Sequence, residues 1–192
     1  GTISTASLSA DDKRDVDRVE TYLNNLKTIA AGFTQINDAG EYRHGTMAIQ
    51  RPGKMRVTYD PPNKDFIVAD GTFLNIWDGE MQQKSSISLD SSIANFILRE
   101  NVKLSGDVMI TKLERRPAMI EITLAVASDP DEGQLTLVFE DKPLRLRQWR
   151  IADSQLHMTT VSLENVQEGM RFEKSMFNFV SPKADKTFRT GR

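Results

Sequence analysis

The chain has 192 residues, of which 39% are apolar and 27% are charged, a composition typical of one globular domain. The net charge of −2 argues against nucleic acid as a partner, because polyanion binding requires a basic surplus. The chain has no cysteine, which excludes disulfides and thiolate metal sites, and no apolar run approaches the roughly 20 residues that span a bilayer.

The first pattern along the chain is helical. Ser9 stands three residues before Asp12, a variant of the capping box that begins many helices. Apolar residues then recur at spacings of three and four until Gly32 and the turn-forming residues 37–40. These apolar positions are Val16, Val19, Leu23, Leu26, Ala30 and Phe33. The pattern predicts one amphipathic helix of about five turns, whose single apolar stripe packs on another element.

After residue 40 the apolar period changes to two, and turns rich in Pro, Gly, Asn and Asp separate the segments. The predicted strands are 42–50, 55–60, 65–70, 73–77, 82–88, 108–114, 119–127, 134–140, 144–151, 155–164 and 176–180. Short strands in hairpin succession predict a mainly β (α+β) domain over residues 1–182. Its single curved antiparallel sheet of about 11 strands is expected to be closed or nearly closed into a barrel. Residues 183–192 are expected to form a charged tail.

Residues 89–99 interrupt the strand pattern in mid-sheet. Asp90 or Ser91 can cap a helix, and Ile93, Phe96 and Ile97 then fall on one face. We expect a short helix over residues 90–99 that covers the mouth of the barrel as a lid, with its apolar face inward.

A hairpin is predicted around Pro52-Gly53, a turn dipeptide between two alternating apolar segments. Arg51 stands where the first of these strands leaves the sheet. The pattern therefore places an arginine at the rim of the sheet.

Motifs of enzyme chemistry are absent from the sequence. It has no phosphate loop, no Rossmann glycine fingerprint, no Gly-x-Ser-x-Gly and no His-Glu-x-x-His. Its two histidines, His44 and His157, lack the spacing of a zinc site. We therefore expect no catalysis, no cofactor and no metal, and a hydrolase with an apolar pocket is disfavoured.

The strands supply more apolar side chains than one sheet face beneath one helix needs. One interpretation is a packed barrel core with methionine as gap filler, and the other is an apolar cavity that holds acyl chains. Periodicity does not separate the two, because both need the same inward face. The residues expected to line such a cavity are Phe33, Met47, Ile49, Met55, Val57, Tyr59, Ile122, Leu124, Leu137, Phe139, Leu146 and Met158.

Several motifs occur in a distinctive order. They are Phe-x-Gln at 33–35, Arg-Pro-x-x-x-Arg at 51–56, Val-x-Asp-Gly at 68–71, Leu-Asn-Ile-Trp-Asp at 74–78 and Phe-x-Phe-x-x-Pro at 177–182. In order and spacing they resemble the periplasmic carriers of outer-membrane lipoproteins, the LolA family, in its alphaproteobacterial form.

The resemblance implies an incomplete antiparallel barrel with a helical lid. It also implies a monomeric periplasmic carrier that binds the acyl chains of lipoproteins. Such a carrier takes its cargo from an inner-membrane ABC transporter and passes it to an outer-membrane receptor, where one exists. The start of the chain, Gly1-Thr2-Ile3-Ser4, is no secretory signal, so we expect a signal peptide to have been removed.

In that family the arginine at the position of Arg51 bonds to lid backbone and holds the empty cavity shut. A guanidinium suits this role, because its five donors can satisfy several carbonyls at once. The same fold also serves envelope-stress sensors and outer-membrane receptor domains, and these are the alternative function.

Overall fold

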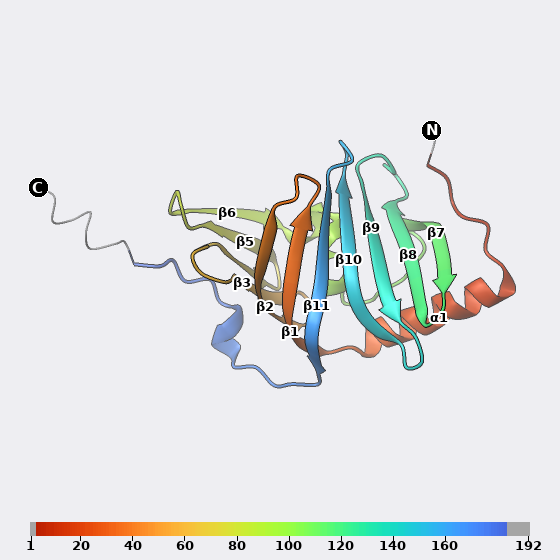
Figure 1. The fold of residues 1–192 in the computed structure, drawn as a ribbon, viewed down its shortest axis with the longest axis horizontal. Helices are drawn as coiled ribbons and strands as arrows, with labels where there is room; N and C mark the ends of the chain where they lie inside the picture. Colours follow the sequence, from red (N-terminus) through yellow and green to blue (C-terminus); the bar gives the residue numbers. More distant parts are fainter. Residues whose placement is uncertain (1–2, 184–192) are drawn as a thin grey trace, which may run out of the picture.

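The computed structural model describes residues 3–183, and within them one open antiparallel sheet of eleven strands dominates (Figure 1). The spatial order is β6-β5-β4-β3-β2-β1-β11-β10-β9-β8-β7, so β6 and β7 are the two edges. The strands are β1 (Thr28–Asn37), β2 (Tyr42–Gln50), β3 (Lys54–Tyr59), β4 (Phe66–Asp70), β5 (Phe73–Asp78), β6 (Gln83–Ser88), β7 (Val108–Arg116), β8 (Met119–Val126), β9 (Gly133–Glu140), β10 (Arg145–Asp153) and β11 (Met158–Glu168). The prediction of a single antiparallel sheet forming an incomplete barrel is confirmed, whereas full closure into a barrel is not observed.

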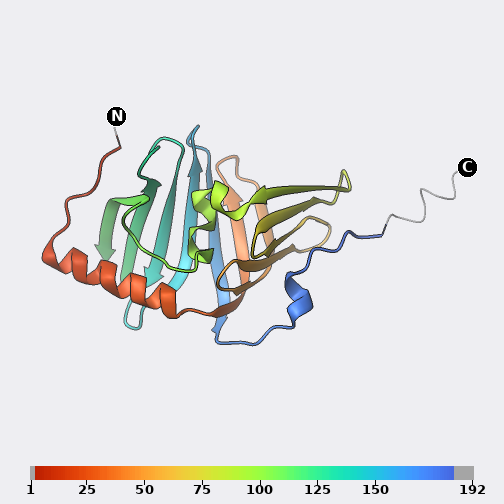
Figure 2. The same ribbon diagram turned by 180° about the vertical axis from the view of Figure 1, so that it is seen from behind.

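Helix α1 (Ala10–Asn25) begins with the capping box that the sequence predicts. The Asp12 amide donates to the Ser9 hydroxyl (3.1 Å), and the Ser9 amide donates to the Asp12 carboxylate (2.9 Å). The helix lies across the half of the sheet formed by β7–β10 and buries Val19 and Leu23 there (Figure 2). We call this side of the sheet its inner face.

The predicted helix is wrong beyond residue 25, because residues 28–37 form strand β1. From Ile29 onward the buried positions recur every second residue, at Ile29, Ala31 and Phe33. β1 pairs with β2 on one side and β11 on the other, so its backbone groups are satisfied in the centre of the sheet. This pairing outweighs the helical spacing of the apolar residues, and it joins the two halves of the sheet.

The predicted last strand, 176–180, is also wrong. Residues Lys174–Phe177 form a short 3-10 helix, η3, which lies against β3 and β4. Phe177 is buried, and Phe179 stacks on Phe66 with ring centroids 5.5 Å apart. Aromatic packing against the sheet, rather than strand pairing, therefore holds this segment. The missed β1 and the extra strand cancel, so the predicted count of about eleven strands agrees with the structure.

The lid consists of two 3-10 helices, η1 (Leu89–Ser91) and η2 (Ile93–Leu98), rather than one helix over 90–99. Ser92 has extended backbone angles and its hydroxyl accepts from the Ala94 amide (3.1 Å), so it ends one helix and caps the next. The lid connects the edge strands β6 and β7 and lies on the inner face (Figure 2). Ile93, Phe96 and Ile97 are buried.

The predicted charged tail at 183–192 lies outside the described residues except for Lys183. Among the helices of residues 3–183, none is long and apolar enough to cross a membrane.

Candidate functional site

An apolar cavity of about 290 Å³ lies between the inner face of the sheet and η2. Strands from both halves of the sheet contribute to its walls, and four lid residues, Ala94, Asn95, Ile97 and Leu98, cover it. Two of its polar groups pair with each other: the Tyr59 hydroxyl donates to Gln35 Oε1 (3.0 Å), and burial raises the pKa of Tyr59, so the phenol stays a neutral donor. A third, the Asn95 side chain, donates to the Leu89 carbonyl (3.2 Å), so the cavity offers a ligand mainly apolar contacts.

Six of the residues predicted at the cavity or the lid line it. They are Phe33, Met47, Met55, Val57, Tyr59 and Ile97. Ile93 and Phe96 are buried in the lid beside the cavity, and Ile49 is buried in β2 outside its lining.

The remaining predicted residues do not line the cavity. Five of them are fully buried in strands β8–β10, in the packed core: Ile122, Leu124, Leu137, Phe139 and Leu146. The Phe139 ring meets the Tyr22 ring of α1 edge-to-face at 5.9 Å, so α1 fills the space above this half of the sheet. Both interpretations of the apolar surplus thus apply, each to a different region: a packed core under α1 and a cavity under the lid.

Met158 lies outside the cavity and is 41% exposed. In β11 the inward positions are Thr159, Val161 and Leu163, so Met158 has the opposite parity and points away from the inner face. Leu156 therefore lies in the turn before β11, and Met158 lies on the outer face of the sheet.

Sequence reasoning missed Trp149 and Ile151, which line the cavity from β10. Leu146 is buried inward, but the pairing with β9 shifts register between Leu146 and Gln148. This irregularity moves the inward positions from even to odd numbers. The other missed lining residues are Gln35, Ile67, Leu74, Ala94, Asn95, Leu98, Thr159 and Val161.

Arg51 connects the end of α1 to the lid. Its Nε donates to the Ile97 carbonyl (2.6 Å) and its Nη2 to the Arg99 carbonyl (2.6 Å), both at the end of η2. Its Nη1 donates to the carbonyls of Leu23 (2.5 Å) and Leu26 (2.8 Å) at the end of α1. Carbonyls at a helix C-terminus carry partial negative charge, so this position suits a cation. We call these four hydrogen bonds the latch.

Within the latch, the buried charge of Arg51 is stabilised by carbonyl dipoles and not by an opposite charge. Arg51 is 7% exposed, and its four acceptors are backbone carbonyls rather than carboxylates. Burial lowers the pKa of Arg51 from its ordinary value, which reflects the cost of removing the guanidinium from water. The cost of desolvation therefore offsets much of the gain from these hydrogen bonds.

Further hydrogen bonds fix the C-terminal end of the lid. The Gly53 amide donates to the Leu98 carbonyl (2.8 Å), next to the latch. Beyond the lid, Asn24 of α1 exchanges two hydrogen bonds with the Val102 backbone (2.8 and 3.0 Å). The chain after η2 is therefore tied to α1 independently of Arg51.

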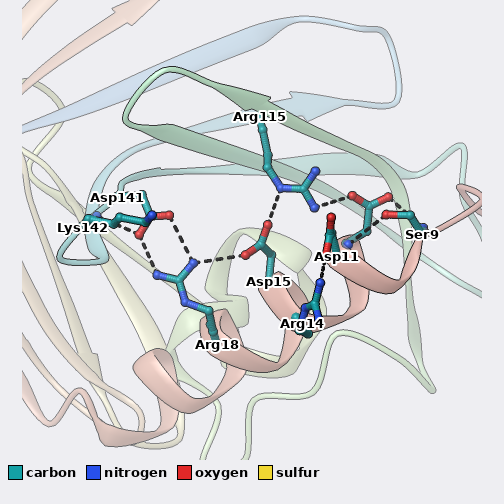
Figure 3. A network of polar contacts seen from close by, with 9 residues as sticks. Ser9, Asp11, Arg14, Asp15, Arg18, Arg115, Asp141 and Lys142 are labelled. Carbon is teal, nitrogen blue, oxygen red and sulfur yellow. Dashed lines mark hydrogen bonds and ion pairs between the residues drawn. The ribbon is translucent and has the colours of Figure 1, made fainter.

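An ion-pair network anchors the N-terminal half of α1 to the sheet (Figure 3). Arg115 of β7 pairs with Asp12 (2.6 Å) and Asp15, and Arg18 pairs with Asp141 in the β9–β10 turn (2.6 Å). The Arg18 guanidinium holds the pKa of Asp141 below its usual value. The helix therefore presents its terminal carbonyls to Arg51 from a fixed position.

A metal centre is not supported by the geometry. Within residues 3–183, no group of three or more Asp, Glu or His side chains is arranged to hold a metal ion. What the arrangement offers chemically is an apolar space beneath η2.

The family model described as "Outer membrane lipoprotein carrier protein LolA" matches residues 24–180. An outer-membrane lipoprotein carrier protein of Pseudomonas putida is 27% identical over 194 residues, covering 93% of this chain and 89% of the relative. An uncharacterized protein of Rickettsia prowazekii is 24% identical over 181 residues, covering 94% and 84%.

Two solved structures show the same fold. A LolA-superfamily protein of Nitrosomonas europaea has a TM-score of 0.50 at 9% identity and covers 90% of this chain and 99% of its own. A conserved protein of Thermus thermophilus has a TM-score of 0.52 at 12% identity, covering 91% and 96%. The fold, the latched cavity and the family match over most of the chain lead to one conclusion: this protein belongs to the LolA family of outer-membrane lipoprotein carriers.

Proposed function

We propose that this protein carries lipoproteins through the periplasm by enclosing their acyl chains in the apolar cavity under the lid. It takes them from an inner-membrane ABC transporter and delivers them to the outer membrane, through a receptor where one exists. The observation that carries the proposal is the latched cavity itself. An apolar space with a removable cover, closed by one arginine, suits a ligand that must be bound and later released.

The closed cavity is smaller than the task requires. Its volume of about 290 Å³ is at the lower limit of ordinary small-ligand pockets, and several acyl chains need more space. The lid residues Ala94, Ile97 and Leu98 therefore leave the cavity when the chains enter. The described form is the empty, closed carrier in this scheme.

Lifting the lid has a free-energy cost that the cargo offsets. Burial of an apolar side chain such as Ile97, Leu98 or Phe96 contributes roughly 1.5–3 kcal/mol, so lifting η2 costs several kcal/mol. Each acyl methylene that becomes buried contributes about 0.8 kcal/mol, so about ten methylenes offset the loss. The lid therefore weakens the net binding of the acyl chains by several kcal/mol, which favours their later release.

Native mass spectrometry of protein purified from the periplasm tests the proposal. We expect an adduct with the mass of an acylated peptide or lipoprotein, which a mild detergent removes. Protein that carries no such adduct, and that binds no synthetic lipopeptide in titration, would contradict the carrier function.

A further inference from the structure

A second, polar groove of about 940 Å³ lies at the strand ends opposite the latch hairpin. Its walls come from the start of β2, the end of β3, the loop between β3 and β4, and the turn between β5 and β6. It is larger than the apolar cavity under the lid, and the acyl chains of the proposed function do not account for it.

Tyr59 is a lining residue of both this groove and the apolar cavity. Its ring meets Phe33, another cavity residue, edge-to-face at 5.6 Å. The guanidinium of Arg43, a groove residue, lies 5.4 Å from the centre of the same ring. The two spaces are therefore neighbours that share Tyr59, one apolar and one polar.

The groove carries charges of both signs, with carboxylates in excess. Arg43 and Lys64 supply cations, and Asp60, Asp78 and Glu80 supply carboxylates. A further carboxylate, Asp65, accepts a hydrogen bond from a backbone amide of the β5–β6 turn (2.8 Å) and pairs with Arg43 (3.5 Å). The groove thus offers several acceptors for the amides of a peptide and two cations that can donate to its carbonyls.

Rings and prolines give the groove flat contact surfaces. Tyr42 is 56% exposed, and Pro61 and Pro62 line the same groove. Tyrosine supplies a large contact area at small conformational cost, and proline carries no amide hydrogen that needs a partner. This combination suits an extended peptide more than a charged small molecule.

We propose that the groove binds the first few residues of the cargo polypeptide while its acyl chains occupy the apolar cavity. The inference rests on the proposed function. A peptide backbone cannot remain in the apolar cavity, because its amides and carbonyls would lack partners there. At Tyr59 the backbone passes from the apolar space into one that supplies such partners.

A competing exit lies beside the latch. A space of about 340 Å³ between Pro52 and the lid shares Asn95 and Leu98 with the apolar cavity. In the closed form the hydrogen bond from the Gly53 amide to the Leu98 carbonyl spans this side. The polar groove is larger than this space, and it adjoins the apolar cavity at Tyr59.

The test compares two synthetic probes, a dipalmitoylglyceryl-cysteine and the same lipid extended by five Gly and Ser residues. For the wild type we expect the extension to increase affinity about five- to tenfold, as a few hydrogen bonds would. Tyr42→Ser should lose most of this ratio of affinities. The matched control Leu156→Ser removes another exposed apolar side chain, 76% exposed and outside the lining of the groove, and should keep the ratio.

A third probe carries a benzophenone on the fourth residue of the extension, and we expect its cross-links on residues 60–65 or 78–80. Three results would overturn the groove proposal and leave the carrier function standing: no gain from the extension in the wild type, a full gain in Tyr42→Ser, or cross-links on residues 88–100. Failure of the wild type to bind the unextended lipid would overturn the proposed function as well.

Discussion

Replacing Arg51 by leucine removes the four hydrogen bonds of the latch and leaves a shorter, apolar side chain. Of the four hydrogen bonds that are lost, two go to the lid carbonyls of Ile97 and Arg99. Hydrogen bonds from a charged donor contribute about 1.5–3 kcal/mol each, so these two contribute roughly 3–6 kcal/mol before the cost of burying the guanidinium. We expect the closed form to lose about 1–3 kcal/mol relative to the open form after that cost.

The functional consequence follows from linkage. A carrier whose closed form is less stable exposes its cavity more often, so its apparent affinity for acyl chains rises by about 5- to 150-fold. Arg51→Leu should therefore bind a fluorescent lipopeptide more tightly than the wild type and transfer it more slowly to acceptor vesicles or receptor. The measurement is a titration followed by a stopped-flow transfer assay.

The matched control is Arg56→Leu in the same hairpin. Arg56 donates to the Met176 carbonyl (3.1 Å) and does not contact the lid. This variant should keep the affinity and transfer rate of the wild type. If a folded Arg51→Leu protein instead shows wild-type affinity and transfer, the latch does not control access to the cavity.

Three further predictions follow. Phe96→Ala, which removes a fully buried lid side chain, should cost about 3–5 kcal/mol of local stability and accelerate amide exchange in η2 but not in α1. Tyr22→Phe removes a hydroxyl that donates to Glu168 (2.6 Å), and it should lower Tm by about 2–8 °C in calorimetry; an unchanged Tm would contradict this. Arg18 lowers the pKa of Asp141 in the folded protein. The ion pair therefore stabilises the fold fully above the unfolded-state pKa of about 3.9, and this stabilisation is lost as the pH falls through the lower folded-state pKa. Thermal melts below about pH 4 should therefore show a steeper loss of Tm for the wild type than for Asp141→Asn, and parallel curves would refute this linkage.

Most of the sheet could be predicted from the sequence because apolar alternation and turn-forming residues are local signals. The hairpin at Pro52-Gly53 and the strands on each side of it follow from a few neighbouring residues. The strand at 28–37 could not be predicted, because its apolar residues satisfy a helical period and a strand period at once. Its pairing with β11, more than a hundred residues away, decides between them.

The lining of the cavity could be predicted only in part, for a related reason. Alternation identifies inward side chains, but it does not tell which half of the sheet a helix fills. Leu137 and Met47 both point inward, yet the first lies in the packed core and the second in the cavity lining. The register shift after Leu146 and the parity of Met158 depend on pairing between strands, which a single sequence does not display.

A photoreactive acyl chain tests the central claim most directly. A lipopeptide with a diazirine near the end of one palmitoyl chain is bound, irradiated and mapped by mass spectrometry of the digested protein. We predict that the label falls on cavity residues such as Met47, Met55 and Ile97. A label on the outer face around Phe66 and Phe179, or on the buried core beneath α1, would contradict the account.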